Sequence, residues 1–170
     1  DGTKEILGNI CSMGSSMIEE VVIPSSIEKI GMDAFEDCKY LTKVDIPENV
    51  IEIGGGAFAG CVRLNEVTFH DNVTETENAE GEKIPFSLTI GNGAFNECKG
   101  IEEINLPVQT TSLGSNFISG TAITEILIPK GVVKCGTNGN NRGPLDGAEQ
   151  LKKVVFEDGT KEILGNICSM

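Results

Sequence analysis

Six cysteines are the residues of this 170-residue chain whose chemistry could include metal binding or redox reactions. Three of them share one spacing, because each follows a phenylalanine by three residues and precedes a leucine or isoleucine by three residues. No two cysteines have the CxxC spacing that zinc and redox sites favour. We therefore expect no metal site and interpret four thiols as small buried apolar groups: Cys38, Cys61, Cys98 and, at a second repeated position, Cys135.

The single histidine, His70, is followed by Asp71 and is the next candidate for catalysis. A catalytic pair of this kind needs a nucleophile held beside the imidazole. His70 instead takes a position at which four similar segments have proline, which predicts a solvent-facing strand end. The carboxylates have no inward placement that would pair two of them, as glycoside hydrolysis requires. These residues argue against an enzyme.

Two glycine-rich stretches, residues 54–56 and 136–143, resemble phosphate-binding loops only in composition. Neither has the GKT or GxGxxG spacing between a strand and a helix. We interpret both as turns and expect no cofactor. The triplet Asn72-Val73-Thr74 fits a glycosylation sequon, but the pattern is common by chance and we assign it no role.

The charge of the chain excludes several classes of partner. Lys and Arg number 13 against 26 Asp and Glu, so the formal net charge is −13. An excess of negative charge repels phosphate backbones and anionic lipid headgroups, so we expect no nucleic-acid partner. No apolar run approaches the roughly 18 residues that a membrane span needs. We expect a segment without membrane insertion, cut from a longer secreted chain.

The elements that would position these residues follow from an internal repeat. Six segments have apolar residues at their first, fourth and sixth positions, and their last residues are 23, 23, 37, 22 and 28 positions apart. The connecting arms repeat too, with an Ile-Gly pair followed by Ala-Phe and then Cys. A fixed period of this length is typical of a solenoid. The segments are residues 18–24, 41–47, 64–70, 101–107, 123–129 and 151–157.

Each unit is interpreted as one coil, with a short strand, a glycine turn, a return arm and a second turn. Stacked coils would align equivalent residues into apolar ladders, such as Val21 with Val44 and Val67, and Ile23 with Ile46 and Phe69. We predict a right-handed leucine-rich-repeat solenoid with a parallel sheet on one face and irregular or short helical return arms opposite. Residues 1–170 would form one segment of about six coils, with a buried ladder of Phe35, Phe58, Phe95 and Phe117.

Two adjacent units carry a resemblance to a known family. They read IPSSIEKIGMDAFEDCKYLTKV and IPENVIEIGGGAFAGCVRLNEV over residues 23–44 and 46–67. They resemble the units of the BspA-like leucine-rich-repeat family, IP-x-x-V-x-x-IG-x-x-AF-x-x-C-x-x-L-x-x-V. The resemblance is strong over residues 18–70 and 88–107 and weak over 108–170. It implies a bacterial protein, located outside the cell or on its surface, with an adhesive role.

The stacked coils also leave a second interpretation open for the cysteines. Equivalent positions on adjacent coils place α-carbons about 5 Å apart, within disulfide range. The χ3 geometry across parallel, in-register positions is usually poor. Buried thiols are therefore favoured, and disulfides remain the alternative.

The two ends of the chain have the same sequence. DGTKEILGNICSM forms residues 1–13 and recurs unchanged as residues 158–170, an offset of 157. The match indicates either near-identical tandem blocks in a longer parent or a deliberately built overlap. Both ends are interpreted as cut in mid-coil, which leaves open strand edges. We therefore expect end-to-end association, or one copy that is docked while the other is poorly packed.

Two surfaces are candidates for ligand binding. Insertions in solenoids form surface loops that often set specificity, and the third and fifth units carry extra residues near 74–87 and 137–143. Neutral drift is the alternative for both insertions. The first has an apolar tip of Ile84, Pro85 and Phe86. The second surface is the outer strand face, with the columns Glu20, Lys43, Glu66, Glu103, Glu125 and Val22, Asp45, Thr68, Asn105, Leu127.

These observations predict a non-catalytic segment that mediates adhesion or binds a protein or glycan ligand, such as a host matrix protein. A merely solvated strand face explains its charges equally well. The alternative function is a structural stalk or spacer, in which tandem 157-residue blocks lengthen the solenoid and display another domain.

Overall fold

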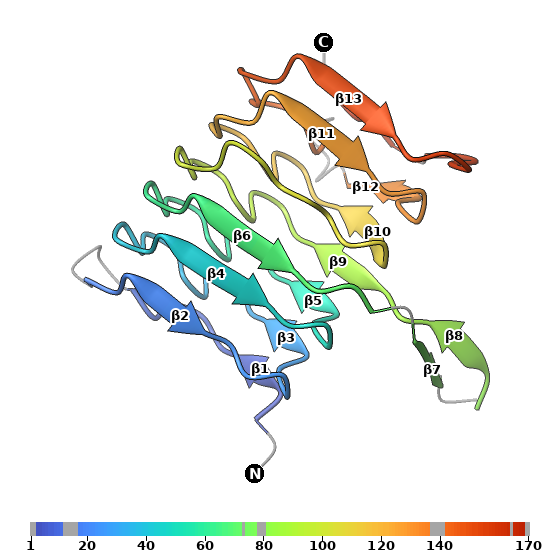
Figure 1. The fold of residues 1–170 in the computed structure, drawn as a ribbon, viewed down its shortest axis with the longest axis horizontal. Coiled ribbons are helices and arrows are strands. Elements are labelled where there is room, and N and C mark those ends of the chain that lie inside the picture. The colour runs from blue at the N-terminus through green and yellow to red at the C-terminus, as the bar shows by residue number, and fades with distance from the viewer. Residues whose placement is uncertain are drawn as a thin grey trace.

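The chain folds as a stack of coils with a parallel sheet on each of two sides (Figure 1). The structure is a computed structural model that describes residues 3–11, 17–72, 74–77, 81–136, 142–163 and 165–168. Consecutive segments of the repeat pair in parallel, which confirms the predicted solenoid. Among the described residues, no helix has the length and hydropathy needed to cross a membrane.

One side, here called the motif face, carries the strands that the repeated apolar pattern predicts. It consists of a three-stranded sheet and a two-stranded sheet. Val21 pairs with Val44 and Val44 with Val67, as the aligned repeats require. The strands are β2 (Glu20–Val22), β4 (Lys43–Ile46) and β6 (Glu66–Phe69), then β11 (Glu125–Ile128) and β13 (Lys153–Phe156).

The return arms form the other side, here called the arm sheet, and they are strands and turns in the described residues. The prediction of short helical arms is therefore wrong. The arms themselves pair in parallel at a strand spacing of about 4.8 Å, which leaves no room on that side for helices about 10 Å wide. The six parallel strands are β1 (Glu5–Ile6), β3 (Lys29–Ile30), β5 (Glu52–Ile53), β9 (Leu88–Ile90), β10 (Thr110–Leu113) and β12 (Lys134–Cys135).

Alternation of side chains explains why two-residue strands suffice on the arms. In β3 and β5 an exposed charged residue precedes a buried isoleucine. Gly54 follows β5 where the preceding coil lies so close that a β-carbon would stand 2.5 Å from the Met32 nitrogen. Only glycine fits such an approach. The repeated Ile-Gly pair is thus the signature of a strand and of tight coil contact.

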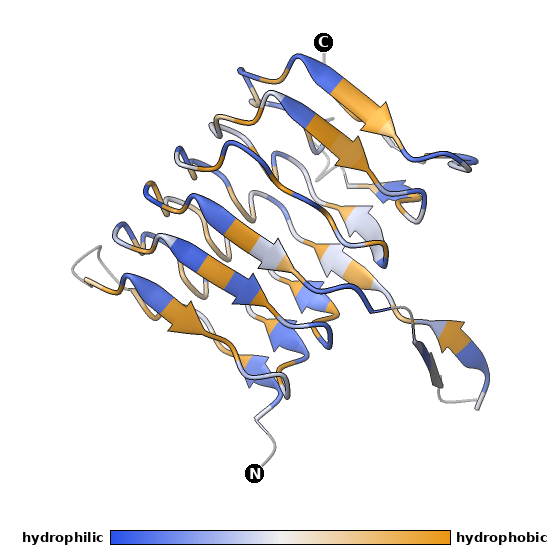
Figure 2. Ribbon diagram, in the orientation of Figure 1, coloured by the Kyte–Doolittle hydropathy of each residue, from blue (hydrophilic) through white to orange (hydrophobic). Residues whose placement is uncertain are grey.

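The core is a ladder of aromatic rings between the two sides. Phe35, Phe58, Phe95 and Phe117 are all buried, which confirms the prediction. The rings of Phe35 and Phe58 stack at 5.1 Å between centroids, and those of Phe58 and Phe95 at 5.3 Å. Along β4 hydrophilic residues alternate with hydrophobic ones (Figure 2), and the hydrophobic ones, Val44 and Ile46, are buried in this core. Val67 and Phe69 of β6 are partly buried and pack against the same core.

The motif face is interrupted at residues 101–107, which were predicted to form a strand. Ile101 and Ile104 are buried as expected, but the segment forms no strand. Charge offers a reason for the missing strand. Glu103 takes the repeat position that Glu66 and Glu125 take in the units before and after it. Like charges on adjacent strands destabilise a ladder.

The insertion in the third unit is a β-hairpin. Its strands β7 (Glu75–Glu77) and β8 (Lys83–Pro85) pair antiparallel. The hairpin projects away from the stack, beside the turns that join the two sides (Figure 1). It is the feature that breaks the regular outline of the solenoid.

Candidate functional site

The hairpin and the first coils enclose a groove, here called the hairpin groove. Its volume is about 760 Å³. Ile84, Pro85 and Phe86 form the wall on the hairpin side. The floor and the opposite wall come from the arm sheet and from the turns at its edge: Lys4, Ser25, Ser26, Glu28, Lys29, Asn49, Ile51, Glu52 and Thr89, with Ser87 at the hairpin base.

The floor of the hairpin groove consists of paired opposite charges. Lys4 Nζ lies 2.5 Å from Glu28 Oε1, and Lys29 Nζ lies 3.2 Å from Glu52 Oε2. All four side chains are exposed by more than a third. The pairs cancel each other's charge, so the floor presents donors and acceptors without a net attraction for anions or cations.

The wall of the hairpin groove is apolar and partly open to solvent. Ile84 is 41% exposed, and the Phe86 ring is half-buried at the hairpin base. The Phe86 amide donates a hydrogen bond of 3.0 Å to the Thr74 carbonyl, which ties the base of the hairpin together. On the opposite turns, Asn49 Nδ2 donates to the Ser25 carbonyl at 2.8 Å. Both walls are thus held by contacts within the chain.

The second candidate surface is the motif face. Where its strands pair, equivalent residues of neighbouring units lie side by side in columns, as the repeat predicts. Glu20 pairs with Lys43 and Lys43 with Glu66. Lys43 Nζ lies 3.1 Å from Glu66 Oε1, and this hydrogen bond and the carboxylate charge raise the pKa of Lys43 above its usual value. Glu125 pairs with Lys153, whose Nζ lies 2.7 Å from Glu125 Oε1.

The second column of the motif face, which begins with Val22, mixes apolar and polar residues. Val22 is 82% exposed and pairs with Asp45, which pairs with Thr68, while Leu127 lies in the separate two-stranded sheet. Glu103 and Asn105 belong to the segment without a strand, and Asn105 Nδ2 donates to Glu103 Oε1 at 2.8 Å. The break divides the expected surface into two patches.

The structure does not bring the two candidate surfaces together. The column residues lie on the motif face, whereas Ile84, Pro85 and Phe86 face the arm sheet and its turns. Ile84 and Pro85 lie in β8 and Phe86 follows it at the hairpin base, so the prediction that these residues form a loop tip is wrong. The sequence predicts the hairpin wall but not the groove floor. The available signal was the polar residue before each Ile-Gly pair, namely Lys29, Glu52 and Thr89. The fifth-unit insertion lies mostly outside the described residues.

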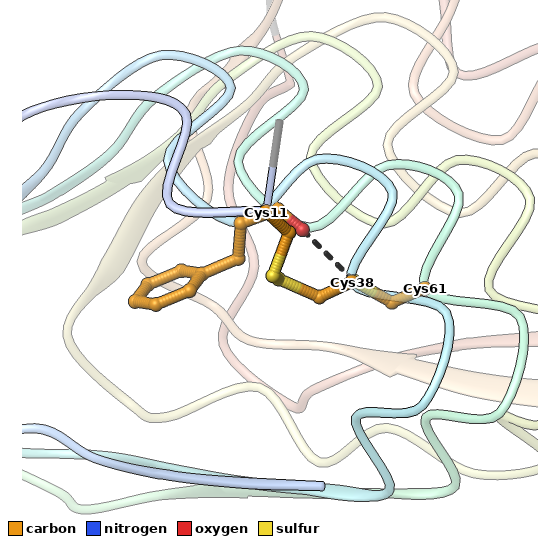
Figure 3. The surroundings of a disulfide bond; sticks show 4 residues. Cys11, Cys38 and Cys61 are labelled. Atoms are coloured by element: carbon orange, nitrogen blue, oxygen red, sulfur yellow. Dashed lines mark hydrogen bonds between the residues drawn. A yellow bond between two sulfur atoms is a disulfide. The ribbon is translucent and has the colours of Figure 1, made fainter. Parts of the chain in front are cut away.

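The structure contains both a disulfide and buried thiols, the two interpretations that the sequence left open for the cysteines. Cys11 and Cys38 form a disulfide with α-carbons 5.2 Å apart (Figure 3), so a buried thiol at Cys38 is wrong. Cys61 and Cys98 are buried thiols, and their Sγ atoms donate to carbonyls of the preceding coil at 3.1 and 3.0 Å. Burial also raises the pKa of Cys135 to about 11. Such thiols are poor nucleophiles.

The remaining polar candidates serve the fold. His70 is exposed at the end of β6, as predicted, and its Nε2 lies 2.7 Å from Asp45 Oδ1. The side chain of Asn72 is buried and donates to the Glu48 carbonyl at 2.9 Å while accepting from Thr74, so it is engaged inside the protein. No cluster of three or more His, Cys, Asp or Glu suited to a metal occurs within the described parts of the chain.

Comparison with known proteins places the chain in a family. Among solved structures, the T. pallidum leucine-rich-repeat protein matches 90% of this chain and 75% of its own at 22% identity, with a TM-score of 0.64. A Bacteroides ovatus leucine-rich-repeat protein matches 94% of this chain and 54% of its own at 23% identity and a TM-score of 0.45. No curated protein matches in sequence. Residues 5–83 and 78–168 match the BspA type leucine rich repeat region in six copies, and the chain therefore belongs to the BspA-type leucine-rich-repeat family.

Proposed function

We propose that the chain is a non-catalytic ligand-binding segment of a bacterial cell-surface or secreted protein, and that the hairpin groove holds a protein or glycan ligand. The observation that carries the proposal is the hairpin itself. It departs from the repeat and encloses a groove of about 760 Å³ against an otherwise regular sheet. Insertions on a rigid solenoid are where such proteins vary their specificity.

The chemistry of the hairpin groove suits a ligand that alternates polar and apolar groups. The charged pairs of the floor and the hydroxyls of Ser25 and Ser26 offer hydrogen bonds, while Ile84 and Phe86 offer apolar contact. Binding sites generally combine an apolar lining with a few placed polar groups. Extended peptides and sugars both present such an alternation, and a binding screen that includes both classes distinguishes them.

The experiment is a binding screen of the whole chain against host matrix proteins, mucins and a glycan array, followed by two matched variants. Ile84 is 41% exposed in the hairpin groove and Leu127 is 50% exposed on the motif face. Ile84→Ser should weaken binding of any ligand found, by roughly tenfold for about 1.4 kcal/mol of lost contact. Leu127→Ser should leave binding unchanged.

The reverse result would assign the ligand to the motif face, and the groove proposal would then fail. Absence of any binding partner across the three ligand classes would count against a binding function as a whole. Circular dichroism of both variants provides the folding control, since neither side chain belongs to the buried core.

A spacer is the second candidate function, favoured by the 13 residues that recur at an offset of 157. Tandem blocks would lengthen a solenoid without changing its cross-section. The sequence of a longer parent discriminates between the two. Many near-identical blocks beside one divergent domain support a spacer, whereas blocks with varied insertions support binding.

A further inference from the structure

The hairpin groove runs along the free edge of a strand in the middle of the chain. Successive residues of a strand point to opposite faces of its sheet. Ile84, Pro85 and Phe86 nevertheless all line the hairpin groove, so the groove follows an edge of β8 and not one face of the hairpin. β7 occupies one edge of β8, and the two strands form a sheet of their own. The groove therefore lies along the other edge, which pairs with no strand in the part of the chain that the structure describes.

The register of the hairpin shows which backbone groups point to this edge. Directly opposed residues of an antiparallel pair alternate between those that hydrogen-bond to each other and those whose amide and carbonyl point outward. The Phe86 amide donates to the Thr74 carbonyl, so Phe86 belongs to the first kind, and so does Ile84 two positions before it. Lys83 and Pro85 belong to the second kind. The edge along the groove thus presents the amide and carbonyl of Lys83 and the carbonyl of Pro85.

The position of Pro85 agrees with this assignment. A proline nitrogen cannot donate a hydrogen bond, and within sheets proline is confined to free edges, strand ends and bulges. At Pro85 no donor toward β7 is needed, so the pairing of the hairpin is complete without one. All three residues of β8 are exposed. The edge is therefore open, with one amide and two carbonyls to offer.

The backbone of a second extended chain is the group that matches such an edge. When a peptide adds to a sheet edge, main-chain hydrogen bonds give affinity and pockets for alternate side chains give specificity. The hairpin groove supplies both, because Ile84 and Phe86 are apolar and the turns at Ser25 and Asn49 are polar. A glycan lacks the regular alternation of amide and carbonyl groups that the edge of β8 presents. These features favour a polypeptide ligand.

Charge indicates which polypeptides fit. Residues 74–86 contain four glutamates and one lysine, and the whole chain has a net charge of −13. The lysine is Lys83, whose Nζ lies 3.7 Å from Glu75 Oε2, so its charge is compensated within the hairpin. A segment rich in Lys or Arg is attracted to this acidic hairpin. A second copy of the chain would bring another acidic hairpin to the same edge and be repelled.

We propose that the hairpin groove binds an extended, basic peptide segment of a partner protein, which adds to β8 as a third strand of the hairpin sheet. The inference rests on the proposed function, since it takes the hairpin groove as the ligand site and names the class of ligand. Two amides of the peptide donate to the carbonyls of Lys83 and Pro85, and the Lys83 amide donates to a carbonyl of the peptide. The side chains of the peptide lie against the apolar wall and the polar turns.

The first test acts on the ligand and leaves the protein unchanged. A display library of short, random, linear peptides is selected on the whole chain, and a glycan array is probed in parallel. We expect the selected peptides to be enriched in Lys and Arg. A selected peptide is then methylated at one backbone nitrogen at a time. Because only every second amide of an extended strand faces its neighbour, binding should weaken about tenfold at two positions separated by one residue, and by less than about twofold at the position between them.

The second test acts on the protein at a single residue. Lys83→Pro removes the amide that points to the groove but no hydrogen bond of the hairpin, and it should weaken binding of the selected peptide about tenfold. Lys83→Ala is the matched control, since it removes the side chain and keeps the amide. It should not weaken binding, because loss of a positive charge favours a basic ligand. Circular dichroism checks the fold of both variants, and the methylation test decides if Lys83→Pro alters the hairpin.

The outcomes separate this inference from the proposed function. A methylation profile without alternation, or equal binding by the Lys83→Pro and Lys83→Ala variants, would overturn strand addition even if peptides bind. Selection of acidic peptides would overturn the charge preference. Binding of glycans alone, weakened by Ile84→Ser, would overturn the inference and leave the hairpin groove as the ligand site. Dimers of the chain that the selected peptide disperses would identify a second copy as the occupant, and no ligand from either source would contradict both proposals.

Discussion

At the scale of single residues, the repeat position of a side chain predicts its environment better than its chemical type does. Phenylalanines at one position stack in the core, and Cys61 and Cys98 at another position are inert and buried. Residues with catalytic potential, such as His70, follow the same rule and lie where the repeat puts a strand end. Departures from the repeat are therefore the informative residues.

Phe58 is the residue whose removal tests the core most directly, because its ring stacks on Phe35 on one side and on Phe95 on the other. We expect Phe58→Ala to lower the free energy of unfolding by about 3–5 kcal/mol, through lost burial and the cavity left behind. Denaturant titration measures the loss. The control is Val62→Ala, at a side chain 36% exposed, which should change stability by less than about 0.5 kcal/mol.

The Cys11–Cys38 disulfide shows where prediction from residues stops. The phase of Cys38 with Cys61 and Cys98 predicts a core position, and Cys38 is buried there. Its partner, however, precedes it by 27 positions rather than by the 23 of the adjacent unit. Because Cys11 lies out of phase with the ladder, only the three-dimensional path of residues 3–11, the described part of the first copy of the recurring sequence, reveals the pair.

At the scale of elements, the apolar pattern predicts the strands of the motif face but not the second sheet. The pattern of apolar-x-x-apolar-x-apolar is long enough to define β4 and β6. The arm strands β3 and β5 contain two residues each, too short for periodicity to identify. The sign of these strands in the sequence is the repeated Ile-Gly pair. That pair indicates a strand only once it is known that the coils stack closely enough to require glycine.

The break in the motif face provides a test of the charge columns. Glu103→Lys would place a positive side chain between Glu66 and Glu125, which are on the neighbouring units. We expect this variant to be more stable by about 0.2–1 kcal/mol, because cross-strand pairs of opposite charge replace like charges. The measurement is denaturant titration at low and high salt, and the gain should shrink as salt screens the pairs.

Glu102→Lys is the matched control. Glu102 is the exposed residue next to Glu103, and its substitution changes the net charge by the same amount. An equal gain in both variants would show that the effect comes from the net charge of −13 and not from the column. The break would then need another cause.

At the scale of the whole molecule, the solenoid is a stack in which each coil contacts only the coils next to it. The hairpin groove and the contacts of the first copy both lie on the first coils, so they share residues such as Lys4 and Glu28. The groove therefore depends on residues 3–11 keeping their place on the first coils.

Stability should be local in such a molecule, and the Cys11–Cys38 disulfide allows a direct test. Reduction removes the covalent attachment of the first copy, which the loop-entropy relation puts at about 3–4 kcal/mol for a separation of 27 residues. We expect residues 3–11 to detach while the central coils remain folded, because coils contact only their neighbours. Hydrogen exchange measures this amide by amide.

The Lys29 and Gly31 amides, which donate to carbonyls of the first copy, should lose protection on reduction. The Gly91 amide, which donates to the Ile53 carbonyl at 2.7 Å in the middle of the stack, is the internal control and should keep its protection. Equal loss at Gly91 and Gly31 would mean that the coils unfold as one unit. The disulfide would then stabilise the whole solenoid.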